Sequence, residues 1–215
     1  MTQSRALEVL LGSEGNVFLT GAPGSGKSYV LNAFIKESIK QGKKLAVTAS
    51  TGIAASLLGG TTLHSWAGLG FNKQENEEVK WWLVNRINEV NILIIDEVSM
   101  LDGATFDRLD VLLRRVRKNH LPFGGMKIVL SGDFFQLPPV GQGGYLFCSQ
   151  GWTNLNLNIC YITEQHRQKS DELIQILSAL RERRFNSSYF KMLLERQIAA
   201  PPNITRLMTH NSGVH

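Results

Sequence analysis

The sequence has 215 residues, of which 43% are hydrophobic, so it can bury the core of one large domain or two small ones. The net charge of +5 fits a polyanionic partner, although the basic residues are spread along the chain and do not prove one. No apolar stretch approaches the roughly 20 residues that span a bilayer, and residues 1–11 lack the features of a signal peptide. Cys148 and Cys160 are too few for a disulfide framework and lack the spacing of a zinc site, so we expect an intracellular protein with no membrane contact.

Five apolar runs have the length of buried strands, and most precede a segment with helical periodicity. This alternation predicts an α/β fold, a parallel sheet flanked by helices, in which ligands gather beyond the carboxyl ends of the strands. Asp102 and Ser170 are expected helix N-caps. The expected strands cover residues 16–20, 45–49, 91–96, 127–132 and 159–163, and the expected helices cover residues 27–41, 52–58, 77–90, 102–119 and 170–184.

Residues 21–28 read GAPGSGKS and fit the phosphate-binding pattern GxxxxGK[ST] between the first strand and the first helix. Glycines let backbone N–H groups surround a polyphosphate, Lys27 is expected to reach the outer phosphates, and the Ser28 hydroxyl is expected to bind magnesium. A simple glycine-rich turn is the alternative, which the matching flanks disfavour. The expected nucleotide contacts are Gly21, Ala22, Pro23, Gly24, Ser25, Gly26, Lys27, Ser28 and Tyr29.

The third apolar run ends in Asp96 and Glu97, and a hydrolase needs one carboxylate near magnesium and another to orient water. We assign Asp96 to the metal and Glu97 to the base. The alternative is two acids that solvate a strand end. A GTPase is disfavoured, because residues 96–99 read DEVS instead of DxxG and residues 72–75, NKQE, are better explained as a polar loop.

Two later loops offer further phosphate contacts. Gln136, in the polar-to-proline turn SGDFFQLPPV of residues 131–140, could sense the terminal phosphate. Arg167, in TEQHRQ of residues 163–168, could stabilise the charge of a phosphoryl-transfer transition state. Taken alone, each has a plain alternative: a proline-rich loop and a surface arginine.

Hydroxyl-bearing residues follow the second strand in residues 48–55, TASTGIAA, and recur in residues 59–66, GGTTLHSW. They suit sugar-phosphate contacts, and a neighbouring aromatic ring could stack on a base. The alternative is that Thr51 caps a helix and that His64 and Trp66 belong to the core. Three other aromatic residues are expected to pack in the core: Phe71, Trp81 and Trp82.

Together these motifs resemble the PIF family of superfamily-one 5′-to-3′ DNA helicases, which are RecD-like. The resemblance covers nearly the whole chain and implies a RecA-like P-loop NTPase domain that uses ATP and magnesium. Six motifs in one order are far more specific than a phosphate loop alone. They are GAPGSGKS, TASTGIAA, GGTTLHSWAGLG, IIDEVSML, LSGDFFQLPPV and TEQHRQ.

The resemblance implies that Gln3 meets the adenine edge and that Gln136 links the phosphate to a DNA-facing loop. It implies the catalytic set Lys27, Glu97, Gln136 and Arg167, with Ser28 and Asp96 at the metal. Along a single DNA strand it implies contacts from Thr48, Ser50, Thr51, Thr61, Thr62 and His64.

Members of this family carry a second RecA-like domain that supplies another arginine. We therefore expect residues 1–200 to form the first motor domain and residues 201–215 to be a connector and the start of a truncated second domain. Such a fragment is expected to be monomeric, to bind ATP and single-stranded, forked or structured DNA, and to show little hydrolysis and no unwinding.

Other functions stay open at this stage: an ATP-gated nucleic-acid-binding module that never translocates, or a small-molecule phosphotransferase. The resemblance leaves the pathway open among replication, repair, recombination, telomere maintenance and quadruplex processing. It implies a cytoplasmic location in a bacterium and a nuclear or mitochondrial one in a eukaryote.

Overall fold

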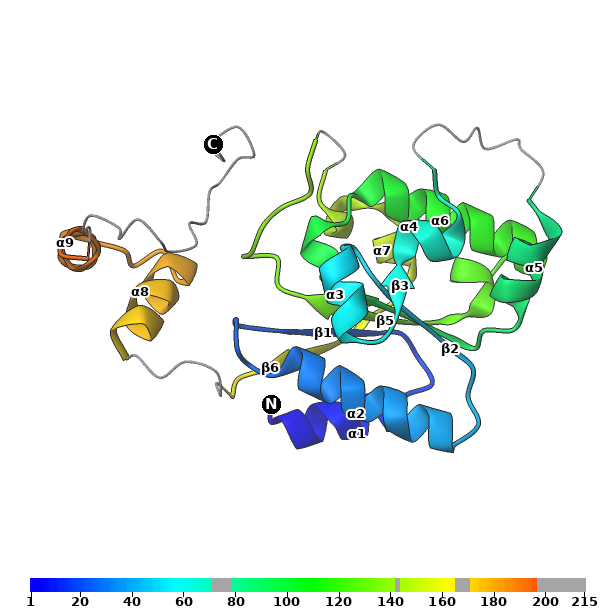
Figure 1. Ribbon diagram of the computed structural model, residues 1–215, viewed down its shortest axis with the longest axis horizontal. Coiled ribbons are helices and arrows are strands. Elements are labelled where there is room, and N and C mark those ends of the chain that lie inside the picture. Colours follow the sequence, from blue (N-terminus) through cyan, green and yellow to red (C-terminus); the bar gives the residue numbers. More distant parts are fainter. Residues whose placement is uncertain (71–78, 142–143, 165–170, 197–215) are drawn as a thin grey trace, which may run out of the picture. The chain divides into compact units, whose positions relative to one another are not determined.

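The computed structural model describes residues 1–70, 79–141, 144–164 and 171–196, and the chain divides into two compact units, residues 1–167 and 168–215 (Figure 1). The first unit contains a parallel sheet with the strand order β3-β2-β4-β5-β1-β6. Its strands are β1 (Val17–Gly21), β2 (Leu45–Ala49), β3 (Thr61–Thr62), β4 (Ile92–Asp96), β5 (Lys127–Gly132) and β6 (Asn158–Ile162).

Helices cover both faces of this sheet (Figure 1). On one face lie α1 (Gln3–Gly12) and α2 (Lys27–Lys40), and on the other lie the helices from α4 to α7. The remaining helical elements of the first unit are α3 (Gly52–Leu57), α4 (Leu63–Ala67), α5 (Trp81–Asn88), η1 (Val98–Met100), α6 (Gly103–Arg117), η2 (Pro122–Gly125), η3 (Leu146–Cys148) and α7 (Gln150–Asn154).

Alternation along the strands creates two cores. In β4, Ile92 and Ile94 join the cluster beneath α1 and α2, while Leu93 and Ile95 join the cluster beneath α4, α5, α6 and α7. Successive side chains of a strand point to opposite faces, so an uninterrupted apolar run is buried on both sides. The buried sheet therefore forms a stable scaffold, and the loops at its edge can hold functional residues in place.

The expected α/β architecture and its five strands are confirmed, with boundaries that differ by at most about one residue. Asp102 caps α6 as expected, because its carboxylate accepts the backbone N–H of Thr105. Ser170 lies outside the described residues. The sequence patterns did not predict α1, β3, α4, α7 or, in the second unit, α9 (Ser187–Leu194).

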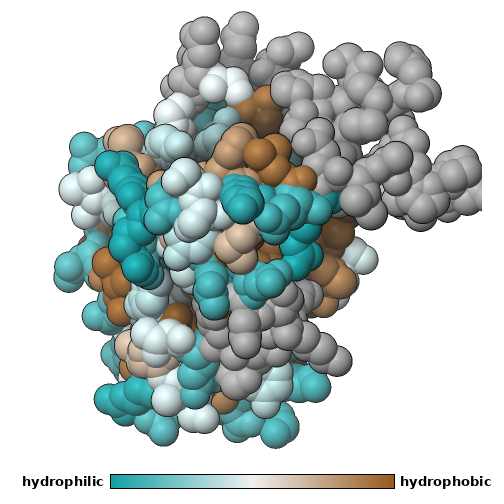
Figure 2. Space-filling view, turned by 90° about the vertical axis from the view of Figure 1, so that its left-hand side faces the viewer, coloured by the Kyte–Doolittle hydropathy of each residue, from teal (hydrophilic) through white to brown (hydrophobic). Residues whose placement is uncertain are grey.

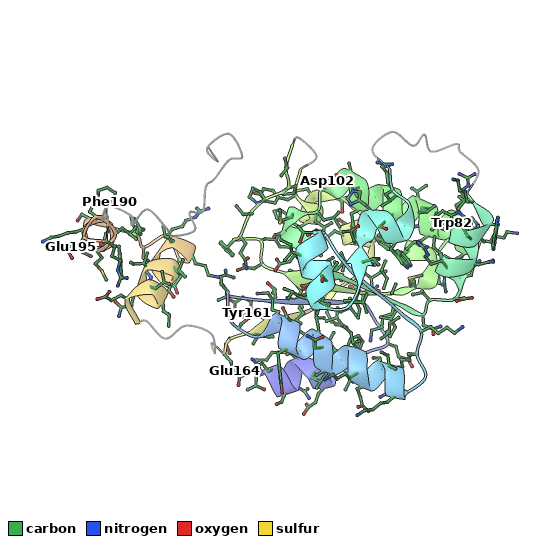
Figure 3. All side chains as sticks on the ribbon, viewed as in Figure 1. Trp82, Asp102, Tyr161, Glu164, Phe190 and Glu195 are labelled. Atoms are coloured by element: carbon green, nitrogen blue, oxygen red, sulfur yellow. The ribbon has the colours of Figure 1, made fainter. Side chains whose placement is uncertain are left out.

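The expectation that Trp81 and Trp82 pack in the core is wrong. Leu83 and Ile87, four positions apart, form the buried stripe of α5, and the two tryptophans lie off that stripe. Trp81 is 75% exposed, and Trp82 lies at the surface beneath the guanidinium of Arg86, 4.9 Å from the ring centroid (Figure 3). Phe71 lies outside the described residues.

The second unit, considered by itself, contains α8 (Asp171–Arg181) and α9. Ile176 and Ala179 are buried, whereas Phe190 of α9 is exposed. Asn186 caps α9 by accepting backbone N–H groups of its first turn.

None of the described helices combines the length and apolarity needed to cross a membrane. On the face drawn in Figure 2, hydrophobic side chains lie interspersed among hydrophilic ones.

Candidate functional site

The carboxyl ends of the strands lie at one edge of the sheet, because all the strand pairs are parallel. Most of the motifs singled out in the sequence begin at this edge. Residues 22–28 follow β1, residues 50–51 follow β2, and Glu97 follows β4. Residues 133–136 follow β5, and residues 163–164 follow β6. The fold thus gathers segments that are distant in sequence.

The phosphate loop between β1 and α2 has the backbone its glycines predict. Gly24 and Gly26 have φ of +81° and +87°, in the left-handed region that favours glycine. The Lys27 ammonium donates to the carbonyl oxygens of Gly21 and Ala22, at 2.9 and 3.3 Å. The loop therefore curls around its own lysine, and the N-terminus of α2 opens toward a cavity.

The cavity has a volume of about 480 Å³ and is lined by four segments of the first unit. The phosphate loop and α2 supply one wall, α1 supplies Gln3, and the loops after β4 and β5 supply Glu97 and Gln136. Its lining residues are Gln3, Pro23, Gly24, Gly26, Lys27, Ser28, Tyr29, Glu97 and Gln136.

Gln3 reaches the cavity through two hydrogen bonds. Its side-chain Nε2 donates to the carbonyl oxygen of Ser25 at 2.9 Å, and its backbone N–H donates to the Glu164 carboxylate at 2.8 Å. Glu164 follows β6 and lies near the start of α1 in Figure 3. An acidic group is favourable there, since it accepts an N–H that the helix leaves without an internal partner.

Two carboxylates lie at the end of β4 as expected, and burial raises the pKa of each. Burial raises the pKa of Asp96, and the ammonium of Lys27 opposes that rise. Burial also raises the pKa of Glu97, with further contributions from the negative charges of Asp96 and Asp133. Glu97 has φ of +53°, uncommon for a residue with a side chain. Perturbed pKa and strained backbone are typical of functional sites.

Gln136 is positioned by its own loop after β5. Its backbone N–H donates to the Asp133 carbonyl oxygen at 2.9 Å, and its side-chain Nε2 lies 3.3 Å from the Asp133 carboxylate. Asp133 is buried and also accepts the backbone N–H of Phe135. The sequence motif did not reveal this supporting role. Arg167, expected to contribute charge beside these groups, lies outside the described residues.

The residues present fit a magnesium nucleotide in their chemistry. Ser28 lines the cavity and Asp96 lies buried at the end of β4, and hydroxyl and carboxylate oxygens are the ligands that magnesium prefers. Within the described ranges, no cluster of three or more His, Cys, Asp or Glu side chains could hold a metal by itself. Magnesium commonly takes its remaining ligands from phosphates and water.

The hydroxyl residues expected at DNA take several different environments. Thr48 is a correction: its side chain is fully buried and its hydroxyl donates to the Ile94 carbonyl oxygen at 2.7 Å, so it cannot face a ligand here. Ser50 donates to the Glu97 carbonyl oxygen at 2.7 Å. Thr51 and Thr62 cap α3 and α4, accepting the N–H groups of residues 54 and 65, as the alternative reading of Thr51 anticipated.

The remaining residues of the segment 59–66 are held by contacts with the core and with α5. Thr61 is exposed, His64 is half-buried, and Trp66 belongs to the core. Arg86 of α5 donates to the carbonyl oxygens of Ser65 and Trp66, at 3.4 and 3.1 Å, where α4 leaves acceptors without helical partners.

The fold and the phosphate-loop cavity define a RecA-like P-loop α/β domain. The chain belongs to the PIF1-like helicase family, whose model matches residues 5–189. It is 40% identical, over its full length, to ATP-dependent DNA helicase Pif1 of Psychrobacter sp. and covers 36% of that protein. It is 39% identical to ATP-dependent DNA helicase RRM3 of Saccharomyces cerevisiae, with 84% of this chain and 27% of RRM3 aligned.

Solved Pif1 structures have the same fold. A Pif1 structure from work on unwinding at forked double-stranded DNA superimposes with a TM-score of 0.88 at 31% identity, over 99% of this chain and 55% of the other. The Bacteroides Pif1 structure in complex with ADP-AlF3 and single-stranded DNA superimposes with a TM-score of 0.86 at 31% identity. The match covers 99% of this chain and 54% of the Bacteroides chain. The chain thus spans about a third of these curated relatives and about half of the solved chains.

Proposed function

We propose that this chain is the first motor domain of an ATP-dependent 5′-to-3′ DNA helicase. The observation that carries the proposal is the cavity in which the phosphate loop, Glu97 and Gln136 converge from three strand ends. A site with these groups suits phosphoryl transfer, in which positioning and charge stabilisation supply most of the catalysis. Family membership and the ADP-AlF3 and single-stranded DNA bound by the Bacteroides relative support the same function.

In this proposal Gln3 recognises the adenine, Lys27 holds the outer phosphates, and Gln136 senses the terminal one. Ser28 and Asp96 would hold magnesium, which would neutralise charge on the phosphates. Glu97 accepts a proton from the attacking water and therefore has to be ionised. Arg167 is proposed as the cation that this domain contributes to the transition state.

Single-stranded DNA is proposed to lie over the segments after β2 and β3. Thr61 is exposed and His64 half-exposed there, while Thr51 and Thr62 present the starts of α3 and α4. Backbone N–H groups and hydroxyls at helix N-termini are common contacts to nucleic-acid phosphates. Forked or structured DNA is the proposed substrate of the complete motor, as the forked-duplex study of a relative suggests.

We further propose that residues 1–200 belong to the first motor domain and that residues 201–215 lead into a second one. Hydrolysis by these 215 residues is then slow, because in such motors a second domain contributes an arginine. A missing transition-state arginine lowers the rate by about three to five powers of ten. The proposed molecule is monomeric and acts inside the cell, on DNA repair, recombination or telomere substrates.

Titration with a fluorescent ATP analogue and with labelled oligothymidine tests these assignments directly. We expect the chain to bind both ligands. Lys27→Ala should lower the affinity for the nucleotide by about tenfold or more, while oligothymidine binding is retained. Salt dependence of oligothymidine binding would report phosphate contacts. A chain that binds neither ligand, or turnover by Lys27→Ala at the wild-type rate, would contradict the proposed function.

A further inference from the structure

Ser50 donates two hydrogen bonds to the end of β4, where Asp96 and Glu97 lie. It follows β2, whose last residue, Ala49, pairs in register with Asp96. Its backbone N–H donates to the Asp96 carbonyl oxygen at 3.1 Å, and its hydroxyl donates to the Glu97 carbonyl oxygen at 2.7 Å. Ser50 thus donates hydrogen bonds to two consecutive carbonyl groups at the end of the neighbouring strand, β4.

These two carbonyl groups lie on either side of the Glu97 Cα atom. The Asp96 carbonyl belongs to the peptide plane before that atom, and the Glu97 carbonyl belongs to the plane after it. Because a peptide group is planar, fixing both planes fixes the only two soft backbone angles of Glu97. Those angles are φ +53° and ψ +44°. A residue with a side chain keeps this left-handed conformation only where its surroundings impose it.

Other contacts hold the chain after Glu97. The Met100 N–H donates to the Glu97 carbonyl oxygen at 3.2 Å and begins η1. Gly132 at the end of β5 lets η1 approach closely, since a Cβ atom there would lie 2.9 Å from a Val98 methyl carbon. Among these contacts, only those of Ser50 reach both peptide planes of Glu97, and they come from the neighbouring strand.

We propose that Ser50 is a positioning residue for ATP hydrolysis: its two hydrogen bonds hold Glu97 in the left-handed conformation that aims the carboxylate into the nucleotide cavity. The proposal rests on the proposed function, in which Glu97 is the base. It replaces the expected role of Ser50 as a DNA contact, because the hydroxyl proton is already donated to Glu97. The DNA contacts then begin at Thr51.

The test measures single-turnover hydrolysis of radiolabelled ATP by the 215-residue chain in molar excess, where slow turnover is still resolved. For Ser50→Ala we expect the rate constant to fall by about ten- to a hundredfold, as a misplaced catalytic group typically causes. ATP and oligothymidine affinities should stay within about twofold of wild type. Ser50→Thr keeps the hydroxyl and should recover most of the rate.

Thr48→Val is the matched control, since Thr48 also bonds β2 to β4, through the Ile94 carbonyl oxygen, away from Glu97. It should lower thermal stability and leave the rate constant unchanged. An equal loss of rate in Thr48→Val and Ser50→Ala would overturn the positioning role. So would Ser50→Ala with weakened oligothymidine binding and wild-type turnover at saturating DNA, which would make Ser50 a DNA contact.

Two further measurements separate this proposal from the proposed function. If Glu97→Gln turns over at the wild-type rate, Glu97 is not the base, and both proposals fail. A crystal structure of Ser50→Ala gives an answer independent of turnover. Departure of Glu97 from positive φ supports the positioning role, and retention of the left-handed conformation overturns it even where the protein proves to be an ATP-driven motor.

Discussion

At the scale of single residues, burial of the Glu97 carboxylate is unfavourable for the stability of the fold. Burial, and then the charge of Asp96, raise its pKa above the ordinary value of 4.5. A raised folded-state pKa means that the carboxylate destabilises the fold at any pH above that pKa. The destabilisation shrinks as the pH falls through the folded pKa and vanishes below 4.5, where the group is protonated in both the folded and unfolded states.

We therefore expect Glu97→Gln to raise the melting temperature of the chain at pH 7 in the absence of nucleotide and magnesium, because the amide carries no charge. The gain should shrink toward pH 4.5. Differential scanning fluorimetry across this range measures it, with Glu89→Gln as the control, because this carboxyl at the end of α5 is exposed and its neutralisation should give a much smaller gain. A gain that is the same at every pH would contradict the electrostatic explanation.

Gly26 illustrates a second residue-scale constraint. An alanine Cβ there would lie 2.1 Å from the Gln3 Nε2 atom, and φ is +87°. Gly26→Ala should strain the loop by about 1–3 kcal/mol and displace Gln3, so we expect ATP affinity to fall by about tenfold or more. Gly42→Ala is matched, with φ of +73° and nothing within 4 Å of the added carbon.

Titration with a fluorescent ATP analogue compares the two glycine variants, and thermal melting reports their strain. Gly42→Ala should lose stability but bind ATP normally. Equal ATP affinity in both variants would mean that the contact between Gln3 and the loop is unimportant for binding.

At the scale of secondary-structure elements, one lysine of β5 bonds the end of α1. The Lys127 ammonium donates to the carbonyl oxygens of Leu10 and Ser13, at the end of a helix that has no basic residue in its last turn. The same ammonium lies 5.5 Å from the centroid of the Phe34 ring of α2. One side chain thus connects β5, α1 and α2.

Lys127→Met keeps most of the packing but leaves the carbonyl groups without this donor. We expect the free energy of unfolding to fall by about 1–3 kcal/mol, measured by urea titration. Lys40→Met is the control, because Lys40 is exposed and its ion pair with Glu37 should contribute less than about 1 kcal/mol. Similar losses in both variants would show that the lysine is not a specific anchor of α1.

At the scale of the whole molecule, the two cores on either face of the sheet are built, among the described residues, from residues 6–162. The residues that line the nucleotide cavity lie between Gln3 and Gln136, within the first unit. We therefore expect residues 1–167 alone to unfold cooperatively and to bind ATP within about twofold of the complete chain. Circular dichroism melting and nucleotide titration check this. A fragment that is unfolded, or that loses ATP binding, would show that the second unit completes the fold or the site.

The strands and the phosphate loop were predictable, because their signals are local. Residues 92–95 form an uninterrupted apolar run, which only a strand buried on both faces explains well, and GAPGSGKS needs its glycines wherever it occurs. The contact of Gln3 with Glu164 joins residues 161 positions apart, and no local pattern encodes it. The α1 helix that carries Gln3 was missed for the same reason: it is stabilised by packing against α2 and β6.

The sequence by itself determined the α/β class, the order of most elements and the location of the phosphate loop, since these follow from apolar periodicity and from a motif whose geometry is local. Only the tertiary structure decided what each polar side chain faces. Thr48 is buried because alternate residues of β2 face the core, and Trp81 is exposed because it lies off the buried face of α5. The register of β2 with β4 brings the Ser50 hydroxyl to the Glu97 carbonyl oxygen. Hydrogen bonds between distant segments depend on register, and a single residue of register decides which face a side chain takes.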